Sequence, residues 1–90
     1  MVTKEDLRVW VFDSEKANGG QATIAQVCKH VWENHEAELR QSGDLFYTWG
    51  YDIRWAAQAL RDAKLFKDNS LCKRGVWEIA EAATAAAVIP

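Results

Sequence analysis

The chain has little proline, little cysteine and no long apolar run, and each shortage excludes a class of protein. Its one proline is Pro90, so no proline-rich linker divides the 90 residues. Cys28 and Cys72 lack CxxC or Cys/His ligand spacing, which argues against a zinc site or a disulfide framework. No apolar run approaches the roughly 18 residues that span a membrane. We therefore expect one globular domain without a metal, a cofactor or a membrane partner.

Signatures of catalysis are missing as well. Carboxylate pairs occur, but the sequence has no Ser/His/Asp order, no glycine-rich phosphate loop and no HExxH. A helical domain of this size also rarely encloses a catalytic cleft. The missing catalytic signatures predict that the protein is not an enzyme. The sequence has two lone thiols and no signal-peptide pattern, which predicts a cytoplasmic protein.

The chain is rich in tryptophan and unevenly charged. Five tryptophans predict a core built largely from aromatic side chains, since each exposed indole would leave a large apolar area in water. The net charge is −2, but residues 53–74 hold six Lys/Arg against two Asp/Glu, a balance of +4. The other residues hold five bases against eleven acids, a balance of −6. A basic segment within an acidic chain predicts a nucleic-acid binder that uses a single face.

Two helices are predicted in the first half of the chain. Thr3 is of the residue type that caps a helix, and the glycine-rich turn at residues 18–20 would end that helix. Residues 9–12 could also form a strand, because their periodicity does not decide between the two. After a short extended segment, apolar residues at helical spacing predict a second helix, which begins at residue 22 or 23 and ends near Leu39.

A third helix and a strand pair are predicted in the second half. Thr48 is a good cap residue, so the third helix is expected to begin there, after an irregular aromatic segment. Residues 65–67 and 76–79 are short β-forming runs separated by turn chemistry, which predicts an antiparallel hairpin. The alanine-rich residues 80–87 predict a further helix.

The fold expected from these elements is α+β, a winged helix with three helices, a small hairpin as its wing and a C-terminal helix. It is one domain over residues 1–90, with residues 80–90 as an alanine-rich extension. His35 lies on the apolar stripe of the second helix and is expected to be packed and hydrogen-bonded. The predicted core contains Trp10, Ile24, Val27, Val31, Ile53, Leu60 and Trp77.

The outward face of the third helix is the main indication of function. Arg54, Gln58 and Arg61 lie about one turn apart on it, and these residue types can read base edges in a major groove. Groups near the helix start could hold a phosphate, and the basic hairpin loop suits a DNA backbone or a narrow minor groove. The predicted nucleic-acid interface comprises Thr48, Tyr51, Arg54, Gln58, Arg61, Lys67, Asn69, Ser70, Lys73 and Arg74.

Each part of this interface also has a simpler interpretation. Most surface helices carry one solvated polar face, and a polar loop can serve solubility alone. Taken singly, neither the helix face nor any one lysine indicates DNA. The two basic features follow one another directly in the chain, and together they favour a polyanion as the ligand.

A longer pattern covers the third helix and the wing. It reads W-A-x-x-x-L-R-x-A-x-L-x(8)-R-G-V-W-x-I and runs from Trp55 to Ile79. This pattern resembles the N-terminal winged-helix domain of Mrr-type restriction proteins and, more loosely, the HARE-HTH winged helices. The resemblance implies DNA binding by a domain that usually precedes a nuclease domain. No PD-(D/E)xK pattern is visible here, so it implies no cleavage activity for this chain.

The chain departs from that pattern at two places. The predicted connection between the second and third helices, residues 39–48, is longer than the usual short turn of a helix-turn-helix unit. The family also tends to place a glycine before the final leucine at the exit of the third helix, where this chain has Lys64.

Two functions follow as hypotheses. The first is a duplex DNA-binding module, either a small regulator or the recognition domain of a restriction or defence protein. The alternative is a winged helix that binds another protein, which the net acidity of the chain favours. Dimerisation through residues 80–87 is compatible with either hypothesis.

Overall fold

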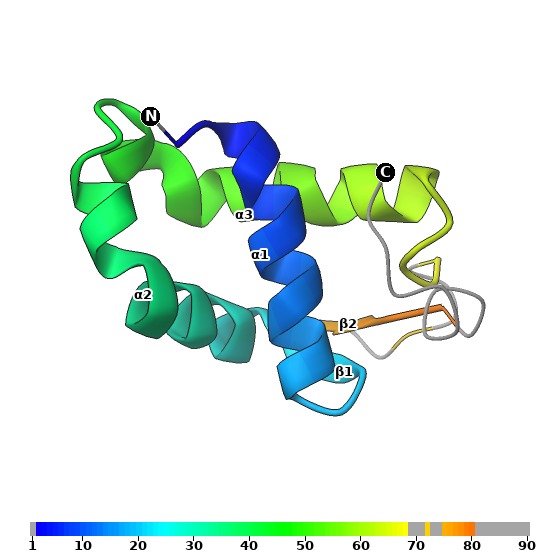
Figure 1. Cartoon of the computed structure of the whole chain (residues 1–90). Helices are drawn as coiled ribbons and strands as arrows, with labels where there is room; N and C mark the ends of the chain where they lie inside the picture. The colour runs from blue at the N-terminus through cyan, green and yellow to red at the C-terminus, as the bar shows by residue number, and fades with distance from the viewer. Residues whose placement is uncertain (1, 69–71, 73–74, 81–90) are drawn as a thin grey trace.

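The computed structural model describes residues 2–68, residue 72 and residues 75–80. Over these residues the protein is a small α+β domain with three helices and a two-stranded antiparallel sheet (Figure 1). Residues 9–12 are helical, which resolves the ambiguity in the sequence. The C-terminal helix predicted over residues 80–87 falls almost wholly outside the described residues. In chain order the elements are α1 (Lys4–Ala17), β1 (Gln21–Thr23), α2 (Ile24–Arg40), α3 (Leu45–Asp62) and β2 (Val76–Glu78).

The first helix begins after the predicted cap Thr3, and the second begins after Thr23, within two residues of its predicted start. In α1 the backbone N–H of Thr3 donates to the Asp6 carboxylate at 3.0 Å. In α2 the Gln26 N–H donates to the Thr23 hydroxyl at 3.2 Å, and the Thr23 N–H donates to the Gln26 side-chain oxygen at 2.8 Å. These bonds satisfy N–H groups at the helix start that would otherwise lack partners. The prediction that Thr3 caps the first helix is confirmed.

The third helix begins four residues earlier than a cap at Thr48 predicts, because its N-cap residue is Asp44. Thr48 lies inside the first turn of α3, where its hydroxyl donates to the Asp52 carboxylate at 2.8 Å. The prediction that Thr48 caps the helix is therefore wrong. Tertiary packing explains the difference, because Phe46 and Trp49 each pack against Trp32 of α2, with ring centroids 6.5 and 6.0 Å apart. Burial of these rings in a helical turn outweighs the local cap preference of a threonine.

The connection between α2 and α3 is short as a consequence. Residues 41–44 alone separate the two helices. The long connection expected over residues 39–48 is therefore wrong, and the turn has the length usual in helix-turn-helix units. Ser42 is buried within this turn, and its hydroxyl donates to the Leu39 carbonyl at 2.6 Å. This bond ties the turn to the end of α2.

β2 pairs with other chain segments on both of its sides. On one side it is antiparallel to β1, with Trp77 opposite Ala22. On the other side, beyond the last residue of β2, Ile79 forms a single antiparallel bridge with Phe66. The predicted hairpin is therefore antiparallel as expected, although residues 65–67 contribute one bridge rather than a full strand.

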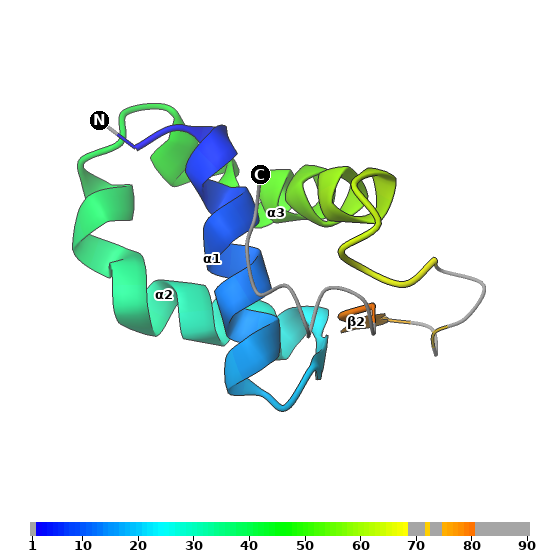
Figure 2. The same ribbon diagram turned by 45° about the vertical axis from the view of Figure 1, so that its right-hand side comes forward.

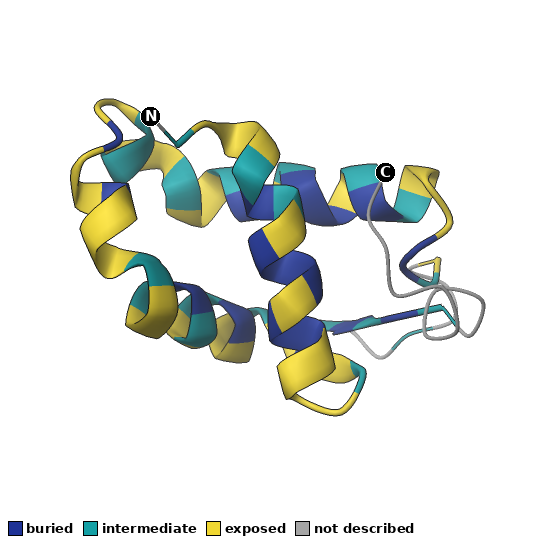
Figure 3. Ribbon diagram, in the orientation of Figure 1, coloured by how far each residue is buried: buried dark blue, intermediate teal, exposed yellow. Residues whose placement is uncertain are grey.

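The core lies where α1 crosses α3 and meets α2 and the sheet (Figures 1 and 2). The buried side of each helix faces this region, and the opposite side is exposed (Figure 3). The predicted core is confirmed except at Ile24, which is only half-buried where α2 leaves the sheet. The buried members of the predicted set are Trp10, Val27, Val31, Ile53, Leu60 and Trp77.

His35 is packed and hydrogen-bonded, as its place on the apolar stripe predicts. Its ring stacks on Trp10 with centroids 3.9 Å apart, and its Nδ1 lies 2.8 Å from a carboxylate oxygen of Glu38. The backbone of His35 is not helical, with φ −133° and ψ 18°, so α2 is kinked there. The contact with Trp10 holds the part of α2 beyond the kink against α1.

The end of α3 places a lysine in a backbone conformation that favours glycine. Lys64 has φ 65°, in the left-handed region. Its N–H donates to the Arg61 carbonyl at 2.9 Å, and the Leu65 N–H donates to the Leu60 carbonyl at 2.9 Å. This pair of bonds forms a Schellman motif, in which glycine is the preferred residue at the position of Lys64.

Replacing Lys64 by glycine should therefore stabilise the domain. We expect Lys64→Gly to raise the free energy of unfolding by on the order of 1 kcal/mol, because it removes the steric cost of a Cβ in the left-handed region. Lys64→Ala is the matched control: it removes the same charged side chain, keeps the Cβ and should change stability little. Urea denaturation of the three proteins measures the effect. A glycine variant no more stable than the alanine variant would contradict this account.

Glu15 is a buried carboxyl group at the end of α1. It is fully inaccessible, and neither of its carboxylate oxygens has a hydrogen-bond partner among the described residues. Burial, together with repulsion from Glu78 of β2, raises the pKa of Glu15 to about 8. Glu15 is therefore expected to be mainly protonated at neutral pH, because its charged form would lie unpaired beside a second carboxylate.

This raised pKa makes stability depend on pH. The folded state holds the Glu15 proton more tightly than the unfolded state, so the domain should lose stability as pH rises from about 4.5 to about 8. Glu15→Gln cannot ionise, so its stability advantage over the wild type should grow across that range by on the order of 3 kcal/mol and then level off. Thermal unfolding of both proteins between pH 5 and pH 9, roughly the span of the two pKa values, measures the difference. A difference that stays constant with pH would contradict the burial argument.

Candidate nucleic-acid interface

One exposed stripe runs along α3 on the side away from the core. Tyr47, Tyr51, Arg54, Gln58 and Arg61 recur every three or four residues, so they fall within an arc of roughly 80° on the helix. Arg61 is half-buried and the other four are exposed. We refer to these five residues as the α3 stripe. It contains two positive charges and no acid, which suits a polyanion.

The C-terminal half of the α3 stripe is organised by hydrogen bonds between side chains. Arg61 Nη1 donates to Gln58 Oε1 at 3.0 Å, and Gln58 Nε2 donates to Asp62 Oδ1 at 3.0 Å. Both groups of the Gln58 amide are thereby held by neighbours one turn further along the surface of α3. Exposed hydrogen bonds of this kind have a small net free energy, so an incoming base or phosphate can replace them.

Arg54 differs from Arg61, which is bonded to Gln58. Its side chain forms no hydrogen bond or ion pair with the rest of the described chain. Burial raises the pKa of the Cys28 thiol in α2, and the nearby positive charge of Arg54 partly offsets that increase. The guanidinium is free to bind a phosphate or a guanine edge in bidentate fashion.

The other predicted site residues fall into four groups. Tyr51 is exposed on the α3 stripe. Thr48 lies off the stripe with its hydroxyl bonded to Asp52, so it does not occupy the helix start from which a phosphate contact was predicted. Lys67 is half-buried beside β2, and its backbone N–H donates to the Glu78 carbonyl at 2.9 Å. The residues outside the described part of the chain are Asn69, Ser70, Lys73 and Arg74.

Tyr47 belongs to the α3 stripe but was not predicted. Its side chain is 81% exposed, and it makes an edge contact with Phe46 at 5.1 Å between ring centroids. Phe46 in turn lies near Trp32, and the Arg40 guanidinium lies 5.2 Å from the Trp32 ring and 5.7 Å from the Phe46 ring. The sequence shows that Tyr47 is four residues before Tyr51. A helix that begins at Thr48 would not include Tyr47, so this spacing did not predict that the two tyrosines share a face.

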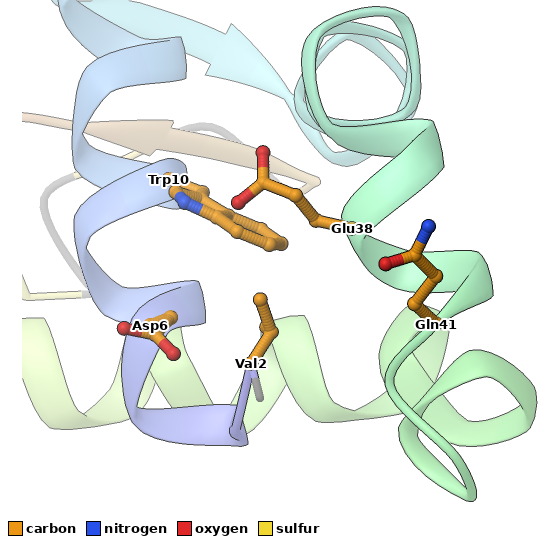
Figure 4. A pocket seen from close by; sticks show the side chains of 5 residues that line it. All are labelled: Val2, Asp6, Trp10, Glu38 and Gln41. Atoms are coloured by element: carbon orange, nitrogen blue, oxygen red, sulfur yellow. The ribbon is translucent and has the colours of Figure 1, made fainter.

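An open pocket of about 500 Å³ lies apart from the α3 stripe, between α1 and the end of α2 (Figure 4). The close-up shows the Trp10 ring at its inner end, with Asp6 on α1 and Glu38 on α2 on opposite sides. One oxygen of each carboxylate is bonded, to the Thr3 N–H and to His35. Two carboxylates around an indole disfavour DNA at this place and suit a cation. Val2 and Gln41 complete the described lining.

Comparison of the chain with protein-family models, with curated proteins and with solved structures finds no match. Within the described residues no helix combines the length and apolar character needed to cross a bilayer. The same part of the chain brings no three His, Cys, Asp or Glu side chains together as a metal site would require. The α3 stripe is therefore the feature of this domain that most directly indicates a function.

Proposed function

We propose that this domain is a winged helix that binds double-stranded DNA, with α3 as its recognition helix. The observation that carries the proposal is the α3 stripe, an exposed helical face with two arginines, a glutamine and no acid. Such a domain would act as a small regulator or as the recognition part of a restriction or defence protein. The resemblance of residues 55–79 to Mrr-type domains supports the same proposal.

The arrangement of the elements supports it independently. A winged helix needs a short turn before the recognition helix and a hairpin after it, and the strand between the first two helices joins the sheet of that hairpin. Residues 41–44 supply such a turn, and β1 pairs with β2. The same order places the basic residues 64–74 directly after the α3 stripe, where a wing would approach the backbone.

In this proposal Arg54, Gln58 and Arg61 enter the major groove. An α-helix fits a groove about 12 Å wide, and the three residues span about 10 Å along the helix axis at 1.5 Å per residue. Arginine bonds guanine edges and glutamine bonds adenine edges, so this half of the stripe can distinguish base pairs. Residues 53–74 have a charge balance of +4 while the rest of the chain is acidic, so the electrostatic attraction to phosphates would come mainly from this segment.

A gel shift on short duplex DNA, with and without base modification and at two salt concentrations, tests the proposal. We expect binding that weakens with salt, because counterions are released when basic side chains replace them at phosphates. Absence of binding to every duplex at the lower salt concentration would overturn the proposal.

The basic residues Lys73 and Arg74, which precede β2 in the chain, should contribute affinity for DNA without sequence preference. The double substitution Lys73→Ala and Arg74→Ala should weaken binding to all duplexes about equally. It should also lower the slope of log K against log[salt] by roughly two units. Binding titrations on a preferred and a scrambled site over a range of salt measure both quantities. If the preference between sites collapsed while the salt slope stayed the same, the loop would read bases, and the roles assigned to helix and wing would be reversed.

Protein binding is the second candidate function, and the pocket beside Trp10 favours it. Asp6 and Glu38 flank an indole there, which suits a lysine or arginine side chain of a partner. This candidate predicts binding to a basic peptide that is weakened by Glu38→Gln and unaffected by changes in the α3 stripe. If the gel shift showed no binding to any duplex, protein binding would be the remaining candidate function.

A further inference from the structure

The two exposed tyrosines of the α3 stripe are not among the residues assigned to the major groove, which are Arg54, Gln58 and Arg61. Tyr47 is 81% exposed and Tyr51 is 78% exposed, which makes them the two most exposed large apolar side chains in the described part of the chain. Exposed aromatic rings on a soluble surface leave apolar area in water, and they commonly mark a binding site. Both rings lie on the same helix face as Arg54 and Arg61.

The α3 stripe is longer than a major groove is wide. From Tyr47 to Arg61 it spans about 21 Å along the helix axis, compared with a groove width of about 12 Å. If the basic half from Arg54 to Arg61 crosses the groove, the tyrosines extend beyond it. Both tyrosines belong to the N-terminal half of α3, and that end of the helix lies away from residues 65–67 and β2 (Figures 1 and 2). The tyrosine half would therefore meet DNA beyond the segment that the basic half and the wing hold.

The Tyr47 ring is supported from behind. It makes its edge contact with Phe46, which packs near Trp32 of α2. Arg40 covers both of these rings and is itself held by an ion pair with Glu36 at 2.8 Å. A ring held by such neighbours loses little freedom when a planar ligand stacks on it, so its exposed face is suited to binding a base.

From these observations, and on the basis of the proposed DNA binding, we infer that the preferred ligand is duplex DNA that continues into an unpaired single strand. Arg54, Gln58 and Arg61 hold the duplex part, and Tyr47 and Tyr51 stack on bases of the unpaired part. In a closed duplex both faces of each base are covered by neighbouring base pairs. Unpaired bases expose their faces, and aromatic side chains bind them with little sequence preference.

The test compares fluorescence anisotropy titrations of one labelled sequence in four forms. These are a blunt duplex, the same duplex with a 5′ overhang, the duplex with a 3′ overhang, and the single strand alone. We expect one overhang polarity to bind roughly tenfold more tightly than the blunt duplex, since a stacked base corresponds to about 5- to 100-fold in affinity. Equal affinity for the blunt duplex and both overhang forms would overturn this inference and leave the duplex proposal standing. Absence of binding to all four forms would overturn both.

Two variants separate stacking from other roles of the tyrosines. Tyr47→Ala with Tyr51→Ala should remove the preference for the overhang, so that within this variant the overhang and blunt forms bind with equal affinity. Tyr47→Phe with Tyr51→Phe keeps both rings and should keep the preference. If the phenylalanine variant also lost it, the hydroxyl groups would be bonding phosphates and the stacking inference would be wrong. Because both side chains are exposed, thermal unfolding should show that all variants remain folded.

Discussion

Replacing Arg54 and Arg61 together by alanine is expected to reduce the affinity for duplex DNA by roughly 100-fold or more, because each lost base or phosphate contact of this kind has a free energy of about 1–3 kcal/mol. The free energy of unfolding should change by less than about 1 kcal/mol, since Arg54 is exposed and the single bond from Arg61 to Gln58 is at the surface. Anisotropy titrations on a duplex, together with thermal unfolding, measure both effects.

A charge-matched control distinguishes the α3 stripe from net charge. Lys16→Ala with Lys29→Ala removes the same two positive charges from exposed positions on α1 and α2. We expect this control to weaken binding only slightly, through long-range electrostatics. If the control lost as much affinity as the stripe variant, the effect would be one of overall charge. If the folded stripe variant bound as tightly as the wild type, α3 would be excluded from the interface.

Leu60→Ala should be the most destabilising of the substitutions considered for this domain. Leu60 is 1% exposed, and its carbonyl also accepts the Leu65 N–H in the motif that ends α3. Truncation leaves a cavity between α3 and its neighbours, and such changes cost about 2–5 kcal/mol. For a domain of this size that is a large part of the total stability, so the variant should unfold at much lower urea concentration.

Val9→Ala provides the comparison for this prediction. Val9 lies on α1 and is 43% exposed, so its truncation removes little buried area and should change stability by less than about 1 kcal/mol. A similar cost for the two variants would show that Leu60 is not the core residue that its burial indicates. The buried face of α3 would then need a different helix phase, and the α3 stripe would move with it.

The sequence predicted those elements whose local and tertiary signals agree. Thr3 and Thr23 cap helices in which the apolar residues already have helical spacing, so both helix starts were predictable. The polar and buried faces of α3 were also predictable, because Ile53 and Leu60 fall on one side and Arg54 and Gln58 on the other. Periodicity is insensitive to where the helix begins, and this explains why the faces were right although the start was wrong.

The remaining features depend on contacts that a sequence pattern does not contain. The first turn of α3 is stabilised because Phe46 and Trp49 pack against Trp32 of α2. This turn includes Tyr47 and places it on the α3 stripe. The kink at His35 depends on the ring of Trp10, which is distant in sequence. Glu15 was not predicted as buried because nothing in its sequence neighbourhood shows that β2 will place Glu78 beside it.

The salt dependence of duplex binding is the most direct test of the central proposal, that α3 and the basic segment after it bind DNA. Affinity of the wild-type chain for one duplex would be measured by anisotropy over a series of salt concentrations. About four phosphate contacts predict that log K falls with log[salt] with a slope near −4, and loss of Arg54 and Arg61 should make the slope shallower. A slope near zero, or a slope identical in the double variant, would contradict the account.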